Sequence, residues 1–251
     1  MEEFMEYQPP EEDFWFKDHV PNFRVLDKKE LPKGVVFGMT YTSIVATPNM
    51  ILPWLRKQLE DSGVKFKRAN VTALLDLDGM GHDILINATG VGTRLLKDVK
   101  DTEVIPIRSQ TVLVRTNYDK VLMRHGADYS VPFTYVIPRG DGTAILGGFR
   151  DYNETAPILN NDMKAGIFKR VHQNLPHVFS ADPAKFDVVR DVIGIHRWRE
   201  VGIRVEREEL NGQKGIHAAI KGGGYICSFG VSKIAADLVN DIHLEVRQSR
   251  L

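Results

Sequence analysis

The most chemically suggestive stretch of the 251-residue chain is Asp191–Glu208, which reads DVIGIHRWREVGIRVERE. Its alternation of β-branched and polar residues predicts a strand. Three cations, His196, Arg197 and Arg199, cluster around Trp198 near the middle of this stretch. Arginine suits a carboxylate because its planar guanidinium donates two parallel hydrogen bonds. The cluster therefore indicates an anion site, although a solvated, salt-bridged strand end is the plain alternative.

Two further stretches join a strand pattern to a glycine turn. Asp83–Ala88 is apolar and too short for a helix, which predicts a buried parallel strand, and Thr89–Thr93 follows as TGVGT before an expected helix at Arg94. Ile216–Val239 runs from a strand pattern through three glycines into a helical pattern. Strand, glycine turn and helix in this order bring backbone amides close to a nucleotide phosphate. A plain strand-to-helix turn has the same pattern and stays an alternative.

Apolar spacing and turn residues predict the elements around these junctions. They are a helix that starts at Thr47-Pro48 and ends at Gly63, two short strands at 64–68 and 70–75, a hairpin around 139–142, and a helix over 161–175.

The composition is that of an ordinary globular protein. The chain is 43% hydrophobic and 26% charged, and its formal net charge of +0 does not suggest nucleic acid or an anionic membrane as a partner. It contains no apolar run of bilayer-spanning length and no His, Cys, Asp or Glu set at metal-ligand spacing. Cys227 is the only cysteine, which excludes an intrachain disulfide and favours an intracellular compartment.

Five segments in order resemble the D-amino-acid oxidases, a family of flavoproteins that includes the D-aspartate oxidases. They are INATG at 86–90, PIRSQTVLV at 106–114, TYVIPR at 134–139, RWRE and RVE within 197–206, and GGGY and FG within 222–230. His196-Arg197 stand where the family has R-P, and Phe229 stands where it has tryptophan. The resemblance extends over nearly the whole chain.

The resemblance implies an α/β fold of the FAD-linked reductase type, with a partial nucleotide-binding domain and a substrate domain built on a mostly antiparallel sheet. Residues 1–44 and 104–203 would form the substrate-binding domain, 45–103 and 204–246 the remainder of the FAD-binding domain, and 247–251 a C-terminal targeting tail. Such flavoproteins open with G-x-G-x-x-G, whose helix N-terminus receives the pyrophosphate. The sequence does not contain this motif, so we expect weak FAD binding or none.

The same resemblance implies the residues of the site. Arg199 and Tyr135 would hold the substrate carboxylate. The FAD would contact Thr89, Gly90, Gly223, Gly224, Tyr225 and Ile226. No protein side chain is expected to act as a catalytic acid or base, and no metal is expected. A tyrosine on a strand more commonly packs, so packing is the alternative for Tyr135.

The implied reaction is FAD-dependent oxidative deamination of a D-amino acid by molecular oxygen, which yields a 2-oxo acid, ammonia and hydrogen peroxide. We expect a neutral substrate because Trp198, Phe133 and Phe229 are available to line an apolar pocket. Acidic D-amino acids, with Arg124 as a second cation, are the alternative substrates. An inactive truncated remnant, or an interaction partner of a full-length oxidase, is the alternative function.

The last three residues, Ser249-Arg250-Leu251, resemble the S-K-L address that directs proteins to peroxisomes. They predict the peroxisome as the location and a peroxisomal import receptor as a partner. A homodimer is a further expectation from the family resemblance.

Overall fold

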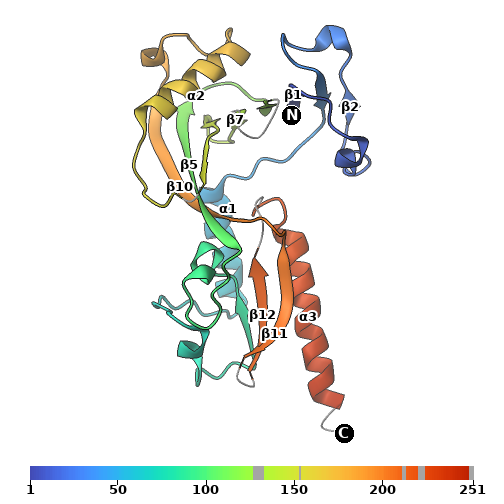
Figure 1. Ribbon diagram of the computed structural model, residues 1–251, viewed down its shortest axis with the longest axis vertical. Helices are drawn as coiled ribbons and strands as arrows, with labels where there is room; N and C mark the ends of the chain where they lie inside the picture. Colours follow the sequence, from blue (N-terminus) through green and yellow to red (C-terminus); the bar gives the residue numbers. More distant parts are fainter. Residues whose placement is uncertain (127–132, 153, 211–212, 220–223, 249–251) are drawn as a thin grey trace. The chain divides into compact units, whose positions relative to one another are not determined.

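The computed structural model describes residues 1–126, 133–152, 154–210, 213–219 and 224–248. It divides the chain into two compact units, shown in Figure 1. Unit 1 comprises Met1–Val64, Ser109–Asp151 and Ala156–Gly194, and unit 2 comprises Lys65–Arg108, Tyr152–Thr155 and Ile195–Leu251. The expected mixed α/β class is confirmed. The proposed substrate and flavin roles of the two parts stay predictions.

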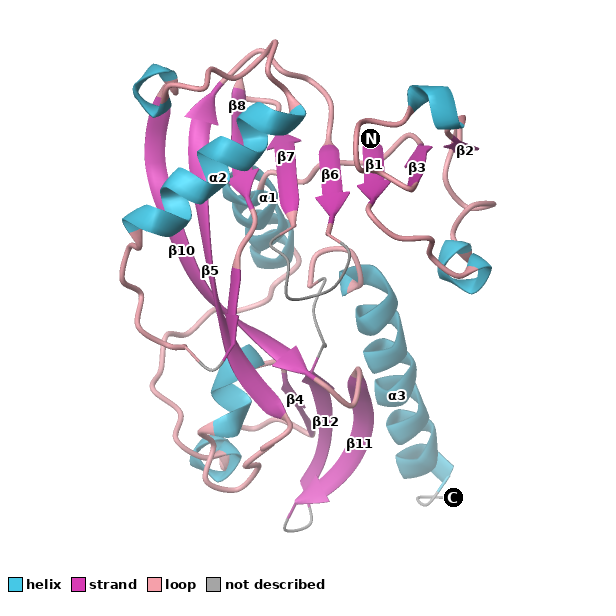
Figure 2. Ribbon diagram, turned by 45° about the horizontal axis from the view of Figure 1, so that its top comes forward, coloured by secondary structure: helices cyan, strands magenta, loops and turns pink. Residues whose placement is uncertain are grey.

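The larger sheet has the order β10-β5-β8-β7-β6-β1-β3-β2, and β9 pairs with β5 (Figure 2). Its strands are β1 (Glu2–Met5), β2 (Arg24–Val25), β3 (Phe37–Thr40), β5 (Val104–Arg115), β6 (Leu122–His125), β7 (Thr134–Pro138), β8 (Thr143–Gly147), β9 (Arg150–Tyr152) and β10 (Val188–Arg199). The pairings β1/β3, β2/β3, β5/β8, β6/β7 and β7/β8 are antiparallel, whereas β1/β6 is parallel. The expectation of a mostly antiparallel sheet is therefore confirmed.

The core of unit 1 is a row of apolar side chains across this sheet. Val112 of β5 lies opposite Leu146 of β8, which lies opposite Val136 of β7. All three are fully buried. Helix α2 (Asn161–Asn174) contributes Ile167 and Val171 to the same cluster. Each such side chain stabilises the fold by roughly 1.5–3 kcal/mol because it leaves water.

The predicted hairpin and both predicted helices of unit 1 are confirmed. Strands β7 and β8 flank the turn 139–142, where the Asp141 carboxylate accepts a hydrogen bond from the Thr143 hydroxyl. Helix α1 (Pro48–Asp61) starts with proline in its first turn and is followed by Gly63 at φ +92°. Helix α2 begins after Asn160, whose side-chain oxygen accepts the Met163 backbone N–H.

The two strands predicted at 64–68 and 70–75 are wrong. No strand is assigned to 64–75, and Leu74–Leu77 is a short 3₁₀ helix instead. The Asp76 carboxylate accepts the backbone N–H groups of Thr72 and Ala73, which closes the chain into a turn. These local bonds compete with strand pairing and override the apolar pattern.

Unit 2 is built on a three-stranded sheet with the order β11-β12-β4. Its elements are β4 (Ile84–Asn87), β11 (Arg204–Leu210), β12 (Gln213–Ala219) and helix α3 (Ser228–Gln248). Strands β12 and β4 are parallel, as predicted for the DILINA segment, and β11 and β12 are antiparallel. Ile216 of β12 is buried with Ala235 and Ile242 of α3.

Short 3₁₀ helices complete the fold at Glu11–Phe14, Lys28–Glu30, Gly90–Arg94 and Pro183–Lys185. The helix expected over Arg94–Leu96 is wrong, because the 3₁₀ helix that starts at Gly90 ends at Arg94. Among the described helices, none combines the length and apolar character that a membrane crossing requires. Within the same residues, His, Cys, Asp and Glu do not gather in groups of three or more suited to a metal ion.

Candidate functional site

The turn after β4 is held by the buried side chain of Asn87. Its Nδ2 donates to the Thr93 hydroxyl at 3.1 Å, and its Oδ1 accepts the Thr89 hydroxyl at 2.7 Å and the Thr89 backbone N–H at 3.2 Å. Gly90 follows at φ +64°, a conformation that glycine adopts without steric cost. These bonds fix the Thr89–Gly90 turn at the carboxyl end of a parallel strand, where α/β folds place their ligands.

The second predicted turn precedes α3. Gly224, Tyr225 and Ile226 are all exposed, and the Ser228 hydroxyl donates to the Tyr225 carbonyl at 2.8 Å. This bond ties the turn to the first residue of the helix. Gly223, which was predicted to contact the cofactor, lies outside the described residues.

Arg197 lies close to both turns. A methyl group added at Gly90 would lie 3.6 Å from Arg197 Nη1, and one added at Gly224 would lie 3.5 Å from Nη2. The guanidinium also lines a cavity of about 500 Å³ between Ile86 of β4 and Val231 of α3. Its Nε is buried without a hydrogen-bond partner among the described residues. Arg197 is thus a cation that faces a cavity with donor capacity to spare.

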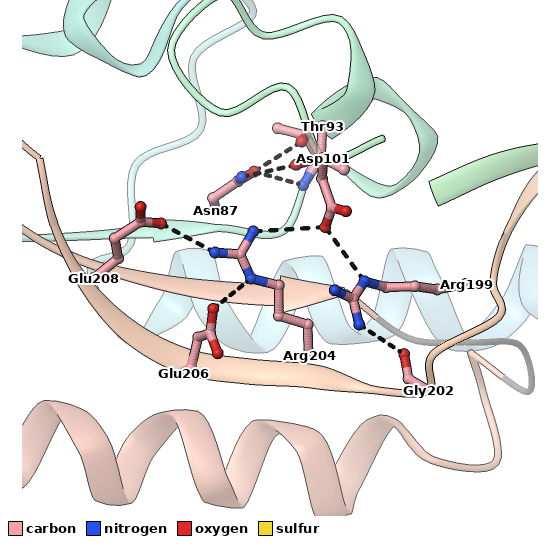
Figure 3. Close-up of polar contacts among 9 residues, drawn as sticks. Asn87, Thr93, Asp101, Arg199, Gly202, Arg204, Glu206 and Glu208 are labelled. Carbon is pink, nitrogen blue, oxygen red and sulfur yellow. Dashed lines mark hydrogen bonds and ion pairs between the residues drawn. The ribbon is translucent and has the colours of Figure 1, made fainter. Parts of the chain in front are cut away.

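Arg199, the predicted substrate residue, is engaged with an acid of its own unit (Figure 3). Its Nε lies 3.4 Å from Asp101 Oδ2, and its Nη1 donates to the Gly202 carbonyl at 3.3 Å. The same Asp101 oxygen lies 3.5 Å from Arg204 Nη1. The Asp101 side chain is only 4% exposed. Its carboxylate is therefore largely desolvated, and it lies between the positive charges of two arginines.

Arg204 extends this network along β11. Its Nε donates to Glu206 at 2.6 Å and its Nη2 to Glu208 at 3.1 Å. Burial by itself lowers the pKa of Arg204, but the Glu206 hydrogen bond and the charges of Glu206, Glu208 and Asp101 together raise it. The RWRE–RVE segment therefore carries an ion-pair network around a buried carboxylate, beside a separate cation at Arg197.

Tyr135 is packed within unit 1. Its ring lies 5.5 Å from the Phe133 ring, and a side chain at Gly147 or Gly148 would overlap it. Burial raises the pKa of Tyr135 to about 12, and the nearby charge of Arg150 offsets this only in part. The phenol is therefore neutral at physiological pH and able to donate one hydrogen bond. Tyr135 belongs to unit 1 and Arg199 to unit 2, so their pairing stays a prediction.

A family model described as "FAD dependent oxidoreductase" matches residues 5–238. The chain belongs to this family. Two curated relatives are a D-amino-acid oxidase of Fusarium vanettenii, 30% identical over 91% of this chain, and a D-aspartate oxidase of Talaromyces thermophilus, 33% identical over 86%. The match spans 66% and 58% of the lengths of these two relatives. The resemblance found in the sequence is thereby confirmed.

Solved structures show the same fold at low sequence identity. A glycine oxidase from Geobacillus kaustophilus has a TM-score of 0.69 at 16% identity, over 96% of this chain and 70% of that one. An L-proline dehydrogenase from P. horikoshii has a TM-score of 0.69 at 14% identity, over 96% and 72%. These likenesses establish an FAD-linked reductase-type fold for the chain.

FAD is the cofactor of this family, and the arrangement in unit 2 fits it in part. The Thr89–Gly90 turn and Gly224–Ile226 lie beside one positively charged side chain, Arg197, which faces a cavity. An arginine with an orphaned buried Nε is suited to an anionic or acceptor-rich group of the cofactor. Strand β4 has β12 as its one partner in the described part of the sheet, so its other edge is open.

The role of Asp101 was not visible in the sequence, because it lies about a hundred positions before the arginines that it neutralises. Asn87 lay within the INATG match, but its bonds to Thr89 and Thr93 were not predicted. The sequence placed Arg197 in the cationic cluster but did not distinguish it from Arg199. Its short distances to Gly90 and Gly224, seen in the structure, make that distinction.

The residues suggested for substrate selectivity are distributed over both units. In unit 1, Arg124 pairs with Glu6 at 2.8 Å, while Phe133 packs on Tyr135. In unit 2, Trp198 donates to Glu200 at 2.6 Å, and Phe229 is 80% exposed. Arg124 therefore already has a carboxylate partner, which is unfavourable to its suggested role with acidic substrates.

Proposed function

We propose that the protein oxidatively deaminates D-amino acids with FAD as cofactor. A D-amino acid, water and oxygen would give a 2-oxo acid, ammonia and hydrogen peroxide. Membership of the FAD-dependent oxidoreductase family, with relatives named D-amino-acid oxidase and D-aspartate oxidase, carries this proposal. FAD, when bound, supplies the hydride acceptor and returns the electrons to oxygen.

The chain's own contribution is to bind and orient. Thr89, Gly90, Gly224, Tyr225 and Ile226 would hold the cofactor through backbone and apolar contacts. The neutral Tyr135 phenol would donate a hydrogen bond to the substrate carboxylate, and the Phe133 ring beside it would exclude water. No side chain needs to accept a proton from the α-carbon, because correct orientation of that hydrogen is the main requirement.

Two arginines are candidates for the carboxylate. Arg199 is the residue implied by the family pattern, but it is held by Asp101 and the Gly202 carbonyl. Arg197 has no carboxylate at ion-pair distance among the described residues, lines a cavity, and lies close to Gly90 and Gly224. This difference favours Arg197 as the residue that receives an anion, with Arg199 as a structural ion pair.

A comparison of Arg197→Lys and Arg199→Lys in flavin-loaded protein decides between them. Lysine keeps the charge but loses the bidentate fork, so KM for D-alanine should rise on the order of 30-fold or more, about 2 kcal/mol or above, in the variant of the binding residue. A KM effect confined to Arg199→Lys would restore the original assignment. Unchanged kinetics in both variants would remove the arginine pair from the substrate site.

The cofactor test is the absorbance spectrum of the purified chain, mixed with FAD and passed over gel filtration. We expect weak flavin retention, because the G-x-G-x-x-G motif is absent from the sequence and the outer edge of β4 is open. Retained flavin with peroxide release from D-alanine supports the oxidase. No flavin and no peroxide at saturating FAD would instead support the alternative, a non-catalytic chain that partners a full-length oxidase.

The substrate class is the next part of the proposal. We infer a preference for neutral D-amino acids, because Glu6 already pairs with Arg124, the cation suggested for an acidic side chain. The ratio of kcat/KM for D-alanine and D-aspartate tests this, since discrimination is expressed in that ratio. A preference for D-aspartate that disappears in Arg124→Ala would overturn it and favour the acidic substrates.

We also propose a peroxisomal location. Residues 249–251 lie outside the described residues, so this rests on the sequence Ser249-Arg250-Leu251 and on the peroxide that the reaction would release. Fusion of the last ten or so residues to a fluorescent protein should give punctate peroxisomal signal, and deletion of the final leucine should abolish it. Diffuse signal from the intact fusion would count against an import receptor as partner.

A further inference from the structure

A second cavity lies in unit 1, on the opposite face of β7 from Tyr135. It has a volume of about 510 Å³ and is lined by Thr134 of β7, the end of α2 and the segment that follows β1. Thr134 and Tyr135 are neighbours on one strand, so their side chains point to opposite faces of the sheet. The cavity is therefore separate from the surface that the proposed function uses.

Three cations and one acid line this cavity, and the acid is already matched. Arg124 Nη2 lies 2.8 Å from Glu6 Oε1, and Nε of the same guanidinium donates to that oxygen at 2.9 Å. The remaining donors of Arg124 bond to Asn174 Oδ1 at 3.1 Å and the Lys33 carbonyl at 3.2 Å. Arg124 thus connects three segments of the chain through hydrogen bonds. The Arg124–Glu6 ion pair adds no net charge to the cavity.

The charge that remains comes from Arg170 and Lys33. The Nη2 of Arg170 donates to the Gly148 carbonyl at 2.9 Å, and its Nε is buried without a hydrogen-bond partner in the described part of the chain. Within the same residues, neither Arg170 nor Lys33 has a carboxylate at ion-pair distance. Burial lowers the pKa of Arg170, in keeping with a partly desolvated guanidinium that has a carbonyl but no carboxylate beside it in the described residues.

An uncompensated guanidinium in a polar cavity favours an anionic ligand, because desolvation of the charge is offset only by a partner of opposite sign. We propose that this cavity is a binding site for a small organic dicarboxylate. One carboxylate would meet Arg170 and the other Lys33, and the exposed amide of Gln173, also on the cavity wall, would donate a further hydrogen bond.

Size and charge favour a dicarboxylate over a single phosphate. Small-molecule sites occupy about 300–1,000 Å³, and this cavity of about 510 Å³ exceeds what one tetrahedral ion fills. The unmatched charge is +2, from Arg170 and Lys33, which equals the charge of a fully ionised four-carbon diacid in magnitude. Such a ligand reaches both cations, whereas a monocarboxylate reaches only one.

Isothermal titration calorimetry of the purified chain without added flavin tests the site. The probes are succinate, acetate and inorganic phosphate at equal ionic strength, with chloride as the reference salt. Succinate should bind, and acetate should bind at least about tenfold more weakly because it engages one cation. Because no flavin or turnover is involved, the outcome is independent of the proposed oxidase activity.

Three variants sharpen the test. Arg170→Gln should weaken succinate binding at least about tenfold, Lys33→Gln should weaken it severalfold, and Arg190→Gln, at an exposed arginine of the same unit, should leave it unchanged. Lys33 is exposed, so its variant keeps the test valid if Arg170→Gln fails to fold. No succinate binding, binding of phosphate alone, or succinate binding that survives both variants would each overturn the proposal.

Discussion

The two units of the molecule are stabilised in different ways. Among the described residues, thirteen buried side chains form one cluster between the sheet and α2 in unit 1, and Ile216, Ala235 and Ile242 form a cluster between the sheet and α3 in unit 2. Unit 2 also has a buried carboxylate, Asp101, between two arginines. In the part of the chain that the structure describes, the largest apolar cluster therefore lies in unit 1, while unit 2 carries the network of two arginines around Asp101.

Both units leave apolar side chains uncovered, and in unit 1 Ile44 is 94% exposed and Trp54 of α1 57%. In unit 2, Ile86 on the outer strand is 48% exposed although its register partner Ile216 is fully buried. Ile226 and Phe229, at the turn before α3, are exposed as well. Parallel sheets are normally covered on both faces. Ile86, Ile226 and Phe229 are therefore apolar side chains that the described part of unit 2 leaves exposed.

Loss of the buried carboxylate should have the largest effect. Asp101→Asn leaves Arg199 and Arg204 without their shared charge, which should destabilise unit 2 by about 3–5 kcal/mol. Hydrogen exchange of the β11 and β12 amides measures this. The matched control is Asp61→Asn, which breaks an exposed ion pair of α1 with Lys57 and should cost below about 0.5 kcal/mol. Equal effects of the two changes would refute the role given to Asp101.

A cavity in the apolar core of unit 1 should rank next. Leu146→Ala removes a fully buried side chain at the centre of the strand row and should cost about 2–5 kcal/mol. The α2 amides should lose protection in hydrogen exchange, because α2 packs on this row. Leu159→Ala, at a partly exposed leucine of the same unit, should change stability by less than about 1 kcal/mol. A smaller loss for Leu146→Ala than for Leu159→Ala would contradict the packing argument.

High pH should act on unit 1 through Tyr135. Burial raises its pKa to about 12, from the ordinary tyrosine value of about 10. A raised folded-state pKa gives stability that is present below pH 10 and lost as pH rises through 12, by up to about 2.7 kcal/mol for two pKa units. Tyr135→Phe should therefore flatten the loss of stability between pH 10 and 12 in denaturant titrations.

Tyr118 offers a matched comparison for the alkaline effect. Burial is the main cause that raises the pKa of Tyr118 to about 12, and the negative charges of Glu2 and Asp119 raise it further. Tyr118→Phe should therefore also reduce the loss of stability between pH 10 and 12. If the unfolding free energy of Tyr135→Phe falls between pH 10 and 12 as steeply as that of the unmodified protein, while Tyr118→Phe shows the expected change, the Tyr135 hydroxyl is better solvated than its burial indicates.

The smallest effect is expected at the open edge of unit 2. Ile86→Ala removes a side chain that is already half exposed, so the isolated chain should lose less than about 1 kcal/mol. Ile216→Ala, at the opposite position of the register, should cost about 2–5 kcal/mol. Denaturant titrations of the two variants compare them directly. Similar losses would mean that β4 is covered on its outer side in solution.

The sequence by itself determined the parts of this protein that depend on neighbouring residues. The helices that follow Thr47 and Asn160, the hairpin around 139–142 and the parallel strand at 84–87 all appear where periodicity and turn residues predicted them. The prediction for 64–75 was wrong, because the Asp76 and Asp98 carboxylates accept hydrogen bonds from backbone N–H groups there and override the apolar pattern. The oxidase resemblance was likewise carried by short local motifs.

Only the tertiary structure decided which charges meet. Arg197 and Arg199 are two positions apart and look alike in the sequence, yet one faces a cavity beside Gly90 and the other pairs with Asp101. The same holds for Arg170, which shares its cavity with Glu6 and Lys33, more than a hundred positions away in the sequence, and has no carboxylate at ion-pair distance in the described part of the chain. Whether a charged side chain is compensated depends on its distance to an opposite charge and on its burial in the folded protein. The amino-acid sequence gives neither of these quantities directly.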